Sequence, residues 1–255
     1  MSNVNVLSVT KSEWIKFRTV RSTVYGTLTM IVISLGLGTL FDWAQAYHPH
    51  GGNVDDPLAR CLGVIQLTQL IIGVIGAMFI TTEYSTGSIR TTLIAVPRRT
   101  LLVMSKLLVM LVSMFILCEL LVVSLFFIGQ AIFNHQIPSI SINYPDALRG
   151  VLLTGLYLVI LAAIGFGLGL IIRQTAGTIV AFVVLVLILP LLSFALPTSW
   201  RLDIQKYLPL QLGSAMGSLN SAPGLFSPWV ATLILTLYAF GICAFGLWNI
   251  NNRDA

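Results

Sequence analysis

Six apolar stretches, each long enough to cross a membrane, constrain this chain more than any other feature. A helix needs about 20 apolar residues to cross the roughly 30 Å of hydrocarbon in a bilayer. Hydrophobic residues make up 56% of the sequence and charged residues only 9%, whereas soluble domains contain about 25% charged residues. We therefore predict an all-α polytopic membrane protein that forms one domain over residues 1–255, with spans at about 23–41, 61–80, 107–133, 150–172, 178–195 and 228–248.

The charges between the spans predict the orientation of the chain. Six spans place both termini on the same side of the membrane, and ten Lys and Arg side chains fall on that side against four on the other. Cytoplasmic segments carry the excess of Lys and Arg, so we expect both termini in the cytoplasm. Because these bases flank apolar spans, the net charge of +5 does not indicate a nucleic-acid partner.

The segment before the first span is basic and has the composition of an interfacial helix. Residues 7–21 include two lysines and two arginines, and one side of a helix would carry Leu7, Trp14, Phe17 and Val24. Such a helix lies on the inner leaflet, with Trp at the headgroups and bases toward anionic lipid. A disordered basic arm is the alternative.

A polar island at residues 83–99 interrupts the apolar sequence between the second and third spans. Gly87 favours a bend and Pro97 a stop, and between them Ile89, Leu93 and Val96 recur at helical spacing. The pattern predicts a short amphipathic helix, which is suited to docking in a groove of a soluble partner. An ordinary polar loop is the alternative.

Polar residues within the predicted spans are the candidates for a path through the membrane. Glu119 lies near the middle of the third span, where an ionised carboxylate is costly. Gln66 and Gln69 of the second span are its candidate hydrogen-bond partners. Glu119 either lines a substrate path or gate or makes a polar contact between helices. Gly165 and Gly169 form a small-xxx-small pair that predicts close helix packing.

Sequence motifs for chemistry are missing from the chain. There is no P-loop signature and no G-x-S-x-G or H-E-x-x-H sequence. The three cysteines, Cys61, Cys118 and Cys243, show no paired spacing, so neither a disulfide nor a metal site is indicated. We expect a chain that is not an enzyme and binds no cofactor or metal of its own.

The island resembles the signature segment of the ABC-2-type permeases, the membrane subunits of bacterial ATP-driven exporters. The matching residues are Glu83, Tyr84, Gly87, Ser88, Ile89, Arg90, Pro97 and Arg99, and Lys106 at the start of the third span agrees as well. Residues 169–178 and the segment from Tyr207 to Met216 are similar to the same family. The resemblance extends over essentially the whole chain.

The resemblance implies a permease that works with other subunits. The island would be a cytoplasmic coupling helix seated in a cleft of a separate ABC ATPase, which binds ATP and Mg. Glu83 and Arg90 would make polar contacts, and Ile89 and Leu93 would fill the cleft. The N-terminal segment with Trp14, Phe17 and Arg18 would be a connecting helix that also touches the ATPase.

The same resemblance implies two permeases per complex, identical or related, in the bacterial plasma membrane. Residues 197–227 resemble a partly re-entrant piece near an outer gate, where Pro209 and Pro223 would break helices. Nothing lining the spans selects among drug, peptide, lipid and glycan substrates. A self-contained channel or secondary transporter is the rival interpretation, although the halves show no evident inverted repeat.

Overall fold

The computed structural model describes residues 6–47, 56–88, 99–133, 145–219 and 224–252. Within these ranges the chain is helical and contains no strand. The elements are α1 (Val6–Thr19), α2 (Arg21–Tyr47), α3 (Pro57–Cys61), α4 (Ile65–Ser85), α6 (Arg99–Ile132), α7 (Pro145–Ile172), α8 (Thr175–Val183), the π-helical turn η1 (Val184–Ile188), α9 (Leu189–Ser193), α10 (Thr198–Gln205), α11 (Pro209–Gly217) and α12 (Pro228–Asn252).

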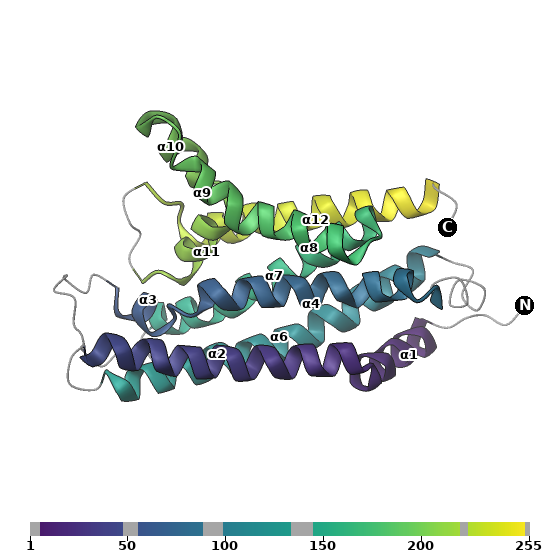
Figure 1. The fold of residues 1–255 in the computed structure, drawn as a ribbon, viewed down its shortest axis with the longest axis horizontal. Coiled ribbons are helices and arrows are strands. Elements are labelled where there is room, and N and C mark those ends of the chain that lie inside the picture. Colours follow the sequence, from purple (N-terminus) through teal and green to yellow (C-terminus); the bar gives the residue numbers. More distant parts are fainter. Residues whose placement is uncertain (1–5, 48–55, 89–98, 134–144, 220–223, 253–255) are drawn as a thin grey trace, which may run out of the picture.

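Six helical segments in the described part of the chain are long and apolar enough to span a membrane, which confirms the predicted multi-pass fold. They are α2, α4, α6, α7, the continuous run α8–η1–α9, and α12. Figure 1 shows them side by side as a bundle, with α1 and the end of α12 at one end and α3 and α11 at the other. Residues on the outer faces of α2, α6 and α12, such as Leu40, Leu120 and Phe240, are exposed apolar side chains suited to lipid contact.

Helix α7 is the centre of the bundle, because it packs against α4, α6, α12, α8 and α11. Small residues allow this close approach. A Cβ atom on Gly165 would collide with the backbone of Gly73 in α4, and one on Gly169 would meet Ile80. On the other side, a Cβ on Gly167 would lie 2.9 Å from Ile242 of α12. The predicted small-xxx-small pair thus lies in the α4–α7 contact, where close packing holds membrane helices together.

The fifth span contains a π-helical turn just before Pro190. Proline has no backbone N–H, and its ring crowds the carbonyl four residues earlier. One wider turn at Val184–Ile188 accommodates that clash without ending the span.

Several predicted boundaries differ from the structure. The first span continues from 41 to Tyr47, so that Asp42, predicted to lie in the outer loop, is inside α2 and buried. The third span begins at Arg99, not at residue 107, so Lys106 lies within the helix. Residues 197–227 include two short helices, α10 and α11; Pro209 begins α11, and Pro223 lies outside the described residues.

Candidate functional site

Four charged side chains form a closed ring where α1, the end of α4 and the start of α6 meet. Lys16 Nζ lies 2.7 Å from Glu13 Oε1 and 3.1 Å from Glu83 Oε1. Lys106 Nζ lies 2.6 Å from Glu13 Oε2 and 2.8 Å from Glu83 Oε1. Each carboxylate therefore contacts both ammonium groups, and the four formal charges sum to zero.

The ring is buried on the side that faces the bundle. The Glu13 side chain is 0% exposed and that of Lys106 is 3% exposed, whereas that of Lys16 is 36% exposed. The Lys106 ammonium group also lies 4.9 Å from the centre of the Phe79 ring, a cation–π contact. Burial lowers the pKa of Lys16, but the hydrogen bond to Glu13 and the charges of Glu83 and Glu13 outweigh it, so that its pKa lies above the ordinary value.

The ring explains the orientation of α1. We predicted one apolar side with Leu7, Trp14, Phe17 and Val24, but α1 ends at Thr19 and Val24 belongs to α2. Among the α1 residues whose burial is described, Val9, Glu13 and Phe17 are buried, while Trp14 and Arg18 are exposed. The prediction was wrong for Val24, which lies on another helix, and it did not include Glu13, which faces inward and meets Lys106.

The aromatic residues continue the contact between α1 and the bundle. Phe17 stacks on Trp14 with ring centres 6.1 Å apart and meets Phe79 of α4 edge-on at 5.8 Å. Helix α1 is therefore held by packing as well as by charge, and it lies against α6 and α2.

Tyr84, beside Glu83, contacts the opposite part of the bundle. The Arg173 guanidinium lies 5.8 Å from the centre of the Tyr84 ring, and its Nη2 donates to the carbonyl of Asn249 in α12 at 3.3 Å. Arg173 sits between α7 and α8 with φ of 59°, a left-handed conformation that is uncommon outside glycine. The last turn of α4 thus contacts α1 and α6 through Glu83. Through Tyr84 it contacts Arg173 in the α7–α8 turn, and Arg173 in turn bonds to α12.

The predicted signature segment begins within this last turn and then leaves the described residues. Helix α4 ends at Ser85, Thr86 is its C-cap, and Gly87 adopts φ of 70°, the left-handed conformation that stops many helices. Thr86 Oγ1 and Ser88 Oγ lie 3.0 Å apart. Ile89, Arg90, Leu93 and Pro97 lie outside the described residues, and Arg99 is the first residue of α6.

The sequence predictions missed Glu13 and the role of Arg173. Glu13 is an acid in an otherwise basic segment, three residues before Lys16, a spacing that brings side chains together on a helix. That spacing, and the position of Lys106 inside the third apolar stretch, were the available signals for a buried ion cluster.

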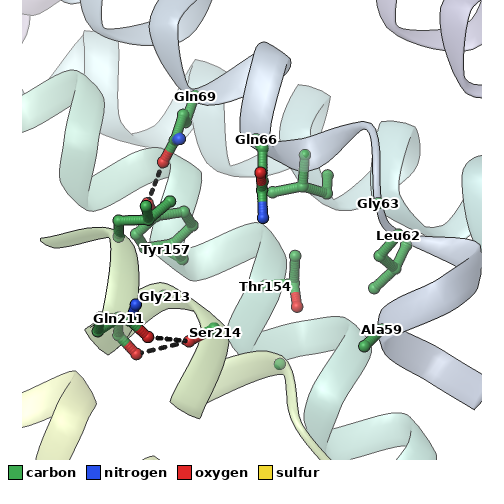
Figure 2. Close-up of a pocket in the computed structure, with 13 residues that line it drawn as sticks. Ala59, Leu62, Gly63, Gln66, Gln69, Thr154, Tyr157, Gln211, Gly213 and Ser214 are labelled. Carbon is green, nitrogen blue, oxygen red and sulfur yellow. Dashed lines mark hydrogen bonds between the residues drawn. The ribbon is translucent and has the colours of Figure 1, made fainter. Parts of the chain in front are cut away.

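A second polar region lies at the other end of the bundle, between α4, α7 and α11. This region contains a pocket with a volume of about 190 Å³. Figure 2 shows Gln66 and Gln69 of α4 facing Thr154 and Tyr157 of α7. The Tyr157 hydroxyl donates to Gln69 Oε1. Helix α11 closes the pocket with Gln211, Gly213, Ser214 and Gly217 among its lining residues.

Glu119 does not join the two glutamines. Its two carboxyl oxygens are buried and make no hydrogen bond to any described residue, so the expected bonds to Gln66 and Gln69 are absent. The carboxyl group instead packs against α7, where a Cβ on Gly155 would collide with it. Asp42 has a similar setting, since its Oδ2 is buried without a hydrogen bond in the described part of the chain and faces Gly129 of α6.

A comparison with protein families decides the relationship of the chain. A family model described as "Protein of unknown function (DUF2705)" matches residues 50–255. The chain belongs to the DUF2705 family. No curated protein matches it. The DUF2705 match includes Glu83, Tyr84, Lys106 and the pocket residues, whereas Glu13 and Lys16 of α1 precede it.

Proposed function

We propose that this DUF2705 chain is the membrane permease subunit of an ABC-2-type exporter, which moves its substrate across the plasma membrane with ATP hydrolysed by a separate subunit. The observation that carries the proposal is the contact pattern of the last turn of α4. Glu83 bonds to lysines of α1 and α6, and Tyr84 packs on Arg173, which bonds to α12. A force applied to the segment that follows would therefore reach α1, α6 and the α7–α8 turn directly, and α12 through Arg173.

The roles of the residues follow from this pattern. The ATPase would bind ATP and Mg and press on residues 86–98, with Ile89 and Leu93 in its cleft and Arg90 at the rim. Glu83, held between Lys16 and Lys106, would transfer the displacement to α1 and α6. Trp14 and Arg18, which are exposed on α1, would contact the same ATPase. A second permease, identical or related, would complete the complex.

The charge distribution supports a cytoplasmic position for this end of the bundle. Ten of the fourteen Lys and Arg residues fall on the side of the termini and of the signature segment, as expected for the inner face of a bacterial plasma membrane.

Co-purification tests the proposal. The chain is expressed with any soluble P-loop ATPase that a neighbouring reading frame encodes, and a complex is isolated through a tag on the ATPase. We expect Ile89→Asp combined with Leu93→Asp to abolish association, because two carboxylates would be buried in an apolar cleft. Leu202→Asp with Ile204→Asp is the matched control, since both residues are exposed on α10 at the other end. Association that survives the first pair of changes contradicts the proposal.

Asp42 and Glu119 favour a second candidate, a proton-coupled secondary transporter. Both are acids inside spans, and each has at least one buried oxygen without a hydrogen bond among the described residues. Intramembrane acids often belong to proton relays. The purified chain alone in liposomes distinguishes the candidates, because a secondary transporter would respond to an imposed pH gradient without any ATPase and the permease would not.

A further inference from the structure

The pocket between α4, α7 and α11 has hydrogen-bonding groups left over. Gln69 is buried and its Oε1 accepts the Tyr157 hydroxyl, so its Nε2 amide has no partner among the described residues. The amide of Gln66 likewise makes no bond within the described structure, and in Figure 2 it points into the space between Tyr157 and Thr154. Gln66 is exposed, so its amide reaches solvent in the empty pocket. A ligand that covered these donors without bonding to them would lose about 1–3 kcal/mol for each donor removed from water, so the pocket favours a ligand that bonds to them.

The lining offers polarity without charge. Its polar side chains are Gln66, Gln69, Thr154, Tyr157, Gln211 and Ser214, and the described lining residues include no Asp, Glu, Lys, Arg or His. An ion would therefore enter without a counter-charge, which is strongly unfavourable in a partly buried site. A wholly apolar ligand would leave the two amides unpaired.

The volume and shape of the pocket limit the class of ligand further. The pocket holds about 190 Å³, less than the roughly 300–1,000 Å³ of sites for whole drug-sized molecules. Leu62, Ile65 and Leu210 supply an apolar wall beside the amides. On the α11 side of the pocket, α11 packs closely against α7. A Cβ on Gly213 would collide with the Tyr157 ring, and one on Gly217 would lie 2.7 Å from Thr154 Oγ1.

We infer that this pocket binds the uncharged, hydrogen-bonding end of an amphipathic compound, with an amide or hydroxyl group against Gln66 and Gln69 and an apolar part against Leu62 and Ile65. The inference rests on the proposed function only where it takes this compound to be the exporter's cargo. Binding itself depends on the pocket alone and requires no ATPase.

Three probes of nearly the same shape and different charge test the inference: benzamide, benzoate and benzamidine. The full chain is placed in phosphatidylcholine nanodiscs, and binding is followed by saturation-transfer difference NMR with empty nanodiscs subtracted. We expect benzamide to bind at least tenfold more tightly than either ion. Gln66→Leu with Gln69→Leu should weaken benzamide on the order of tenfold, the loss of about two hydrogen bonds.

Two controls keep the outcome decisive. Gln174→Leu changes an exposed glutamine between α7 and α8, away from the pocket lining, and should leave benzamide binding unchanged. If the double variant does not fold, Gln66→Leu alone serves, because Gln66 is exposed and not needed for packing. Equal binding of an ion, no binding of benzamide, or benzamide binding that is unaffected by the glutamine changes would overturn the inference.

The outcome is separate from that of the co-purification test. Selective benzamide binding in a chain that associates with no ATPase would reject the exporter and keep the site. Association with the ATPase without benzamide binding would keep the exporter proposal and reject the binding site.

Discussion

At the scale of single residues, the ring of Glu13, Lys16, Glu83 and Lys106 places charge in a largely buried position at one end of the bundle. A buried ion pair adds little net stability compared with apolar residues, because desolvation offsets much of the attraction. Removing one partner is different, since the remaining charges lose their compensation. The ring should therefore be sensitive to single changes and tolerant of changes that keep it neutral.

Lys106→Met tests this sensitivity. Two buried carboxylates would be left with only Lys16, which is 36% exposed, so we expect a loss of about 3–5 kcal/mol in the free energy of unfolding. The measurement is denaturant-induced unfolding of the purified protein in detergent. Lys11→Met, at an exposed lysine of α1, is the control and should change little. Adding Glu13→Gln to Lys106→Met should recover part of the loss; equal stability of the Lys11 and Lys106 variants would show that the ring is not formed.

At the scale of elements, α11 is fastened at its C-terminal end by two residues from other helices. Asp56 caps α3 by accepting from the N–H groups of Leu58 and Ala59, and its other oxygen accepts from Leu219 N at 2.8 Å. Arg149 Nη2 of α7 donates to the carbonyls of Ser218 and Leu219. These contacts hold α11 as the wall of the polar pocket.

Asp56→Ala should loosen α11 without dissolving the bundle. The change removes an N-cap, which costs about 0.5–2 kcal/mol, together with the bond to Leu219. We expect faster amide hydrogen exchange over residues 209–219 and unchanged exchange in the middle of α7. Asp203→Ala on α10, whose carboxylate pairs only with Lys206 in the described structure, is the control. Protection of α11 that is the same in both variants would count against this fastening.

Whether a helix could be predicted from the sequence depended on the length of its apolar pattern. The six spans were predictable because each has a long apolar run, and a long apolar run is enough to identify a membrane-spanning helix. The helices α10 and α11, with 8 and 9 residues, are too short for periodicity to separate them from a loop. The face of α1 was missed because an apolar pattern alone cannot show that Glu13 is neutralised by Lys106, far along the chain.

The pocket illustrates the same limit for a site. Gln66 and Gln69 were singled out because polar residues are costly in a span, and both do line the pocket. Their partner could not be predicted, since Tyr157 lies on a different span and the register between α4 and α7 is set by contacts such as Gly165 on Gly73. Sequence spacing carries no information about such register between helices.

At the scale of the whole molecule, the two polar regions lie at opposite ends of one bundle and share α4. The last turn of α4 bears Glu83 and Tyr84, and its first turns bear Gln66 and Gln69. Close contacts of Gly73 and Gly76 with α7 lie between them. Helices α4 and α7 touch along their backbones and so connect the charged end to the pocket. In the proposed permease, this arrangement would carry a displacement from the ATPase side to the pocket.

That arrangement is useful only if the charged end faces the cytoplasm, and cysteine labelling in intact bacteria tests this. Single cysteines are introduced at Arg18 or Asn252 at one end and at Trp200 at the other, all at exposed positions. The three native cysteines are buried and should react slowly. We expect a membrane-impermeant maleimide to label position 200 in intact cells, and positions 18 and 252 only after permeabilisation, because the end with ten of the fourteen bases belongs inside. Labelling of position 18 before permeabilisation would place the ring of Glu13 and Lys106 outside the cell, where no ATPase could act on it.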